Sequence, residues 1–108
     1  MTPGVAVVIV DAENVRRSLR PNPSRAELVE RARAWARRER HELLIVFDGA
    51  PPEEAPDLVG AAHADDAVVR LAHEPADEVW VVTSDRGLRG RLGTVARLVG
   101  GGTFARQL

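Results

Sequence analysis

The chain has 108 residues, enough for one compact domain over residues 1–108 with its own core and too few for a second. It contains no cysteine, which excludes disulfides and thiolate metal sites, so any metal ligand must be an oxygen or an imidazole. The net charge is −1, and all 15 basic residues are arginine, so contact with nucleic acid would need a local arginine patch. No apolar run approaches the roughly 20 residues of a membrane span, and we expect a cytoplasmic protein without membrane contact.

The N-terminal half predicts two strands separated by a long helix. Residues 5–10 are almost all β-branched or apolar, which indicates a strand buried on both faces and therefore parallel. Residues 16–20 predict a short helix or turn. Ser24 then begins a long helix, and Glu27 completes a capping box. The apolar face of this helix is formed by Leu28, Val29, Ala32, Trp35 and Ala36. Residues 43–47 predict the second strand.

The C-terminal half continues the alternation of strands and helices. Residues 49–54 are a proline-rich turn, and residues 57–62 predict a short edge strand of low β-propensity. A helix over 65–73, a strand over 79–83 and a helix from Ser84 or Asp85 to residue 92 follow. Residues 95–99 predict the last strand, and residues 103–108 a C-terminal turn. The alternation predicts an α/β domain of three layers, α/β/α, with a parallel sheet of four to five strands.

Four apolar stretches end on, or lead into, an aspartate. Asp11 and Asp48 follow the first two strands, Asp85 follows the strand 79–83, and Asp65 opens the helix 65–73. The carboxyl ends of parallel strands meet at one edge of the sheet, where ligands of α/β proteins bind. Carboxylates that converge there suit Mg²⁺ or Mn²⁺, which can activate water and neutralise a phosphodiester. We therefore predict a metal site with Asp11, Asp65 and Asp85 as ligands.

Each acid also has a purely structural interpretation. Asp48 precedes Gly49 and can bind backbone amides in a turn, and Asp85 can serve as a helix N-cap. Asp66 can take the place of Asp65 as the ligand, or it can be an exposed first-turn charge favoured by the helix dipole. The sequence leaves these alternatives open.

Several polar and basic residues near the acids are candidates for substrate binding. Asn14 can orient a water or phosphate, or cap a helix, and Ser84 can donate to a phosphate or cap the next helix. Arg16, Arg17 and Arg86 flank the predicted acid edge and can contact an RNA backbone. With two tryptophans and two phenylalanines in the chain, we expect no aromatic platform for stacking single-stranded bases.

The ordered set of four motifs carries a resemblance to a known family. Val-Asp-Ala-Glu-Asn (10–14), Val-Phe-Asp-Gly (46–49), Ala-Asp-Asp-Ala-Val-Val (64–69) and Val-Thr-Ser-Asp-Arg (82–86) resemble the NYN branch of the PIN-like nuclease superfamily, especially its YacP-like group. The resemblance spans nearly the whole chain. It implies a PIN-like (Rossmann-like) fold with strand order 3-2-1-4-5, and its members include metal-dependent ribonucleases.

The resemblance has two departures, and they define the competing functions. Ala12 and Glu13 replace the usual middle pair of the first motif, and little chain lies between Asp48 and Asp65. The first function is a Mg²⁺- or Mn²⁺-dependent endoribonuclease with catalytic Asp11, Asp48, Asp65 and Asp85. The alternative is a catalytically inactive RNA- or ribosome-binding module of the same fold. The thin edge strand is compatible with a monomer or with a homodimer formed by edge pairing.

Overall fold

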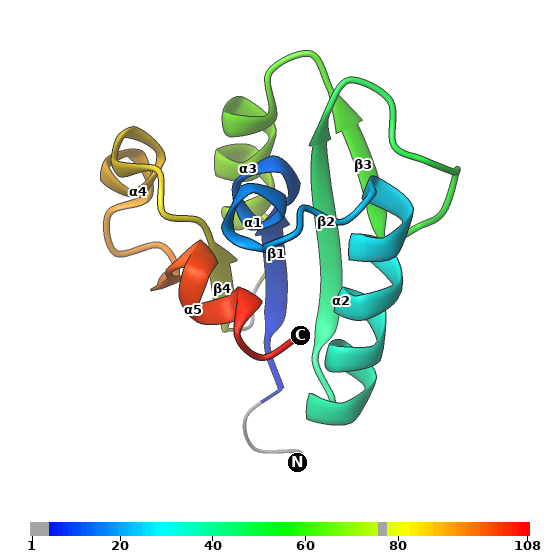
Figure 1. The fold of residues 1–108 in the computed structure, drawn as a ribbon. Helices are drawn as coiled ribbons and strands as arrows, with labels where there is room; N and C mark the ends of the chain where they lie inside the picture. The colour runs from blue at the N-terminus through cyan, green and yellow to red at the C-terminus, as the bar shows by residue number, and fades with distance from the viewer. Residues whose placement is uncertain (1–4, 76–77) are drawn as a thin grey trace.

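The computed structural model describes residues 5–75 and 78–108, and within them a five-stranded, entirely parallel sheet forms the centre of the molecule (Figure 1). Its strands are β1 (Val7–Asp11), β2 (Glu42–Asp48), β3 (Leu58–Ala61), β4 (Val79–Val82) and β5 (Arg97–Val99). Their order across the sheet is β3-β2-β1-β4-β5. The predicted α/β class, parallel pairing and 3-2-1-4-5 order are therefore confirmed.

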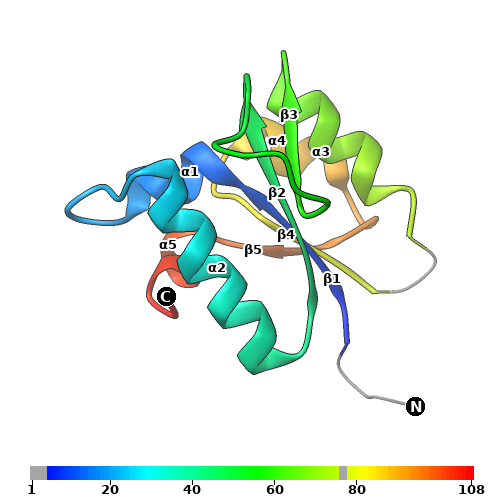
Figure 2. The same ribbon diagram turned by 90° about the vertical axis from the view of Figure 1, so that its right-hand side faces the viewer.

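Helices cover both faces of the sheet, as Figure 2 shows. One face carries α1 (Ala12–Ser18), α2 (Arg25–Glu39) and α5 (Gly101–Ala105), and the other carries α3 (Ala64–Ala72) and α4 (Arg86–Leu92). Alternate residues of β1 supply the two cores, because Val8 and Val10 pack toward α2 while Val7 and Ile9 pack toward α3. β1 is buried along its whole length, which agrees with its β-branched sequence.

The long helix α2 follows its sequence pattern closely. Ser24 Oγ accepts the Glu27 N–H at 3.0 Å, and Glu27 Oε1 accepts the Ser24 N–H at 3.3 Å, which completes the predicted capping box. All five residues of the predicted apolar face are buried. The helix ends at Arg40, which adopts a left-handed conformation with φ of 58°.

Three predicted boundaries were wrong. The first short helix begins at Ala12 instead of residue 16. It follows β1 directly, so among the described residues no loop separates Asp11 from α1. The last strand spans Arg97–Val99, and Val95 lies in an exposed turn before it. The C-terminal helix starts at Gly101, two residues before the predicted turn, inside a glycine run that favours a loop by composition. Tertiary packing against α1 overrides that local preference.

The connection from β2 to the parallel edge strand β3 is short and contains no helix. It is held against α2 by Arg33, whose Nε and Nη2 donate to the two carboxylate oxygens of Asp57 at 2.8 and 2.9 Å. Arg33 Nη1 also contacts Glu53 Oε1 at 3.1 Å. Within residues 5–75 and 78–108, every helix is too short or too polar to cross a membrane.

Candidate functional site

The four predicted acids lie around the carboxyl ends of the three central strands. Asp11, the last residue of β1, is level with Val46 of β2, and Asp48 ends β2 two residues further on. On the other side of β1, Val10 pairs with Val82, so Asp85 follows the end of β4 by three residues. Asp65 is the second residue of α3, which begins above the same edge. Topology thus brings together acids that are up to 74 residues apart in the sequence.

Asp11 is the buried member of the group, with 8% of its surface exposed. Its Oδ2 accepts a hydrogen bond from Thr83 Oγ1 at 2.9 Å, and Thr83 Oγ1 in turn accepts the Asp85 N–H at 3.2 Å. The pKa of Asp11 is raised, first by burial and then by the negative charges of Asp65 and Asp48, while the Thr83 hydrogen bond opposes the shift. The charges of two of the other three acids, Asp65 and Asp48, therefore act on Asp11.

Asp65 lies on the exposed side of the same electrostatic group. Burial is the largest cause of its raised pKa, and the charges of Asp85 and Asp48 add to it. The neighbouring Asp66 is engaged differently, because its Oδ1 forms an ion pair with Arg91 Nη1 at 2.8 Å. Of the two candidates at the start of α3, Asp66 is therefore neutralised by a partner, whereas Asp65 remains repelled by other carboxylates.

Asp48 and Asp85 each use one carboxylate oxygen to bind a backbone amide. Asp48 Oδ1 accepts the Ala64 N–H at 3.0 Å, at the start of α3, and Asp85 Oδ1 accepts the Leu88 N–H at 2.9 Å as the N-cap of α4. Gly49 has φ of 82°, as expected for an Asp-Gly turn. Among the described residues, the second oxygen of each carboxylate has no hydrogen-bond donor. The structural role of these acids thus occupies half of each carboxylate.

A polar cavity of about 410 Å³ opens beside these acids. Its lining includes Asp48, Asp65 and Asp66, together with Arg91 and His63, whereas Asp11 and Asp85 do not line it. A larger hollow, of about 520 Å³, lies beside the turn between β2 and β3. That hollow is mostly apolar and has one carboxylate in its lining, Glu54, whereas the smaller cavity is lined by three aspartates, so we take the acid-lined cavity as the candidate site.

The oxygen donors present are of the kind that a hard divalent cation prefers. Burial is the largest cause of the raised pKa values of Asp11 and Asp65, and such an ion would relieve the mutual repulsion that adds to it. In the part of the chain that the structure describes, however, no three carboxylate or imidazole groups lie close enough together to form a complete metal site. The donor chemistry therefore fits Mg²⁺ or Mn²⁺, while a closed coordination shell would need movement of the exposed acids.

A second polar network connects helix α1 to the loop before α4 and to the start of α5. Ser84 N–H donates to Asn14 Oδ1 at 2.9 Å, and Gly101 N–H donates to Ser84 Oγ at 2.8 Å. A Cβ atom at Gly101 would overlap Asn14 Oδ1, so only glycine permits this approach. Asn14 Oδ1 and Ser84 Oγ, the side-chain atoms of two predicted substrate-binding residues, therefore accept hydrogen bonds from backbone amides of the protein itself. The role of Gly101 was not predicted, because a glycine run offers no signal of which glycine has a close neighbour.

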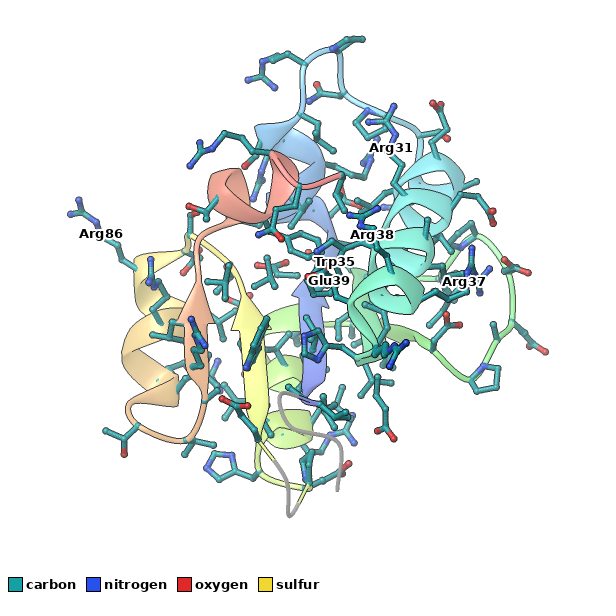
Figure 3. All side chains as sticks on the ribbon, turned by 90° about the horizontal axis from the view of Figure 1, so that it is seen from below. Arg31, Trp35, Arg37, Arg38, Glu39 and Arg86 are labelled. Atoms are coloured by element: carbon teal, nitrogen blue, oxygen red, sulfur yellow. The ribbon has the colours of Figure 1, made fainter. Side chains whose placement is uncertain are left out.

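The three predicted substrate-binding arginines differ in their surroundings. Arg16 Nη1 pairs with Glu13 Oε2 at 2.6 Å and Arg16 Nε donates to the Pro23 carbonyl at 3.0 Å, so its guanidinium is engaged within the protein. Glu13 Oε1 also accepts from Arg25 Nε at 3.0 Å, which links α1 to α2. Arg17 is exposed and close enough to lower the pKa of Asp11. Arg86, at the start of α4, extends away from the body of the protein in Figure 3.

Comparison with known proteins supports the fold. No family model matches the chain, and no curated protein sequence matches it. Among solved structures, the chain is similar to a mutant of Rae1 (YacP) from Bacillus subtilis, with a TM-score of 0.81 and 17% sequence identity. The similarity covers 95% of this chain and 74% of the Rae1 chain. The resemblance to the YacP-like group is thus confirmed as a match of fold, and at this identity it assigns no residue a role.

Proposed function

We propose that this protein is a cytoplasmic, Mg²⁺- or Mn²⁺-dependent endoribonuclease that hydrolyses RNA phosphodiester bonds at the acid edge of its sheet. The observation that carries the proposal is the set of carboxylates around Asp11. Asp11 is buried, no basic side chain among the described residues bonds to it, and its pKa is raised first by burial and then by Asp65 and Asp48. An arrangement that places like charges together at a strand edge costs stability, and a divalent cation is the ligand that would offset this cost.

Asp11, Asp65 and Asp85 are the residues that we expect to hold the ion. Such an ion neutralises charge on the phosphate and lowers the pKa of water to the neutral range. Thr83 fixes the orientation of Asp11 through Oδ2, and among the described residues Oδ1 accepts no hydrogen bond and can serve as the ligand oxygen. Asp48, tied to Ala64 N–H by one oxygen, can accept a proton from the attacking water with the other. Arg17 and Arg86 provide positive charge on either side for the RNA backbone.

Cleavage of a labelled single-stranded RNA by the purified protein tests the proposal. We expect cutting with Mn²⁺ or Mg²⁺, none with EDTA, and none in the Asp11→Asn variant. Glu42→Gln is a matched control, because Glu42 is an exposed acid at the start of β2, the opposite end of the sheet. Cutting that persists in EDTA or in Asp11→Asn at the wild-type rate would remove the proposal.

A second function, an inactive RNA- or ribosome-binding module, is favoured by one specific observation. Asp48 and Asp85 bind backbone amides, and no three acids of the described residues converge into a metal site. This function predicts RNA binding that weakens with salt and depends on Arg17 and Arg86, without cleavage in any divalent ion. Binding and cleavage measured on the same RNA separate the two functions.

A further inference from the structure

The structure gathers most of the aromatic side chains of the chain at one place, although the composition predicts no aromatic platform. The Trp80 ring of β4 lies against His41, with ring centroids 4.6 Å apart and planes inclined at 54°, and the His41 centroid lies 5.6 Å from that of Trp35 of α2. Trp35 meets the edge of Phe104 of α5 at 4.8 Å. Trp35 and Phe104 are buried in the core, so the cluster is not an open stacking platform, and its members are spread over residues 35 to 104 and brought together by the fold.

A cavity of about 240 Å³ lies beside these rings, between the β4–β5 half of the sheet, α2 and α5. Its walls include Trp35, Trp80, Arg97, Phe104 and Gln107. Glu39 also lines the cavity. Figure 3 shows Trp35 and Glu39 on the side of α2 that faces α5, and Arg37 on the other side. The volume is below that of drug-sized pockets, about 300 Å³ and more, and suits a single ring system.

The polar atoms of this cavity are unequally satisfied. Trp35 Nε1 donates to Gln107 Oε1 at 3.0 Å. Trp80 Nε1 is buried and has no hydrogen-bond partner among residues 5–75 and 78–108. This nitrogen is shielded from solvent, so the donors that the cavity offers to a ligand come from Arg97.

Arg97 adds both a planar group and hydrogen-bond donors. It lies opposite Trp80 in the parallel pair of β4 and β5, and its guanidinium carbon is 4.9 Å from the centroid of the Trp80 ring. Guanidinium planes and indole rings are the surfaces on which nucleobases stack. The adjacent donors suit the carbonyl oxygens and ring nitrogens at the edge of a base, and Glu39 can accept from an exocyclic amine. An apolar peptide side chain would leave these donors unpaired.

We propose that this cavity binds one nucleobase, stacked on the guanidinium plane of Arg97 and beside the edge of Trp80. The base can belong to a free nucleotide or to single-stranded RNA. Trp80 is level with Val8, three residues before Asp11, so the cavity lies about 10 Å along the strands from the acid edge. The proposal concerns binding alone, and it stands whether or not the acids catalyse hydrolysis.

The two indole N–H groups allow a direct test by ¹H–¹⁵N NMR, since the chain has two tryptophans and both line the cavity. The Trp80 resonance is assigned by its disappearance in Trp80→Phe. The wild-type protein in EDTA is titrated with AMP, GMP, CMP and UMP, with ribose 5-phosphate as the ligand without a base, and with a short single-stranded oligoribonucleotide.

We expect a saturable shift of the Trp80 indole resonance with at least one base-containing ligand and none with ribose 5-phosphate. A response to mononucleotides identifies a free-nucleotide site, and a response to the oligonucleotide alone identifies a subsite for a base of an RNA strand. No shift with any ligand up to 10 mM, or an equal shift with ribose 5-phosphate, would overturn the proposal.

Variants separate this cavity from the acid edge. Arg97→Ala should raise Kd about two- to fivefold, the size of a lost cation–π contact. Arg70→Ala is the matched control, because Arg70 lies on α3 at the opposite face of the sheet. Asp11→Asn should leave nucleotide binding unchanged even where it abolishes cleavage, so the two proposals fail independently. An unchanged Kd in Arg97→Ala, at a fold verified by circular dichroism, would exclude Arg97 from the site.

Discussion

A single methyl group at Gly101 tests whether Asn14 positions the acid edge. A Cβ at Gly101 would overlap Asn14 Oδ1, whereas a Cβ at Gly102, the next residue of the same helix, would meet nothing within 4 Å. Asn14 Oδ1 accepts the Ser84 N–H at 2.9 Å, one residue before Asp85. Gly101→Ala therefore forces the Asn14 side chain to rotate and break this hydrogen bond, while Gly102→Ala leaves it intact.

The expected size of the effect follows from two opposing contributions. Alanine in place of glycine stabilises a helix by up to about 1 kcal/mol, which both variants gain. Loss of the Asn14–Ser84 hydrogen bond costs about 1 kcal/mol, and residual crowding brings the difference between the variants to about 1–2 kcal/mol. For a domain of this size that difference corresponds to about 4–8 °C in Tm.

Differential scanning calorimetry in EDTA measures the Tm difference, and RNA cleavage with Mn²⁺ measures the functional effect. We expect Gly102→Ala to cut like the wild type and Gly101→Ala to cut about 10- to 100-fold more slowly, because the loop that carries Asp85 is displaced. In an Asn14→Ala background, adding Gly101→Ala should lower neither the Tm nor the cleavage rate any further. Equal Tm values and equal rates for the two glycine variants would refute the positioning role of Asn14.

Three further predictions concern the acids and the β2–β3 connection. Mn²⁺ at about 100 times its Kd should stabilise the wild type by about 2.7 kcal/mol, or about 10 °C in Tm. Asp11→Asn should lose this gain in Tm. An equal gain in both proteins would exclude Asp11 as a ligand. Burial and neighbouring acids raise the pKa of Asp11 and Asp65, so their contribution to stability is complete below the unfolded value near pH 4 and is lost as the pH rises through the folded pKa. In EDTA, Asp11→Asn should therefore gain more Tm over the wild type at pH 7 than at pH 4, and a constant difference contradicts this reasoning. Arg33→Met should lower the free energy of unfolding, measured in urea, by about 1–2 kcal/mol because it removes the bidentate contact with Asp57. Arg31→Met is the control. The ion pair of Arg31 with Glu27 is 4.0 Å long and exposed, so its loss should change the free energy of unfolding by less than about 0.5 kcal/mol.

The fold was predictable where the sequence signal and the tertiary demand agree. β1 lies at the centre of the sheet and is buried on both faces, so its β-branched run identifies it and its parallel pairing. The capping box at Ser24 marks the start of α2 to the residue. The C-terminal helix α5 was missed because Gly101 and Gly102 oppose helix formation locally, and the reason for the glycine lies 87 residues earlier at Asn14.

The candidate site was predictable in its acids and not in its partners. Apolar runs that end in aspartate indicate strand ends, and the parallel order then places Asp11, Asp48 and Asp85 at one edge. No rule of spacing shows that Glu13 engages Arg16, because an i, i+3 pair is equally compatible with two solvated side chains. The gathering of Trp35 and Trp80 around His41 is likewise a property of the fold, and composition does not show it.

The structural and the functional interpretations of Asp48 and Asp85 are compatible, because a carboxylate has two oxygens. Asp48 Oδ1 fixes the start of α3, and Asp85 Oδ1 fixes the start of α4. Each bond orients the carboxylate and leaves its second oxygen without a donor in the described chain. The stability gained by helix capping offsets the entropy lost when the side chain is immobilised. Asp65 has no such bond there and remains exposed, which makes it the acid that has to move when a cation binds. Metal affinity should therefore depend more on how readily Asp65 turns toward Asp11 than on the placement of Asp48 or Asp85.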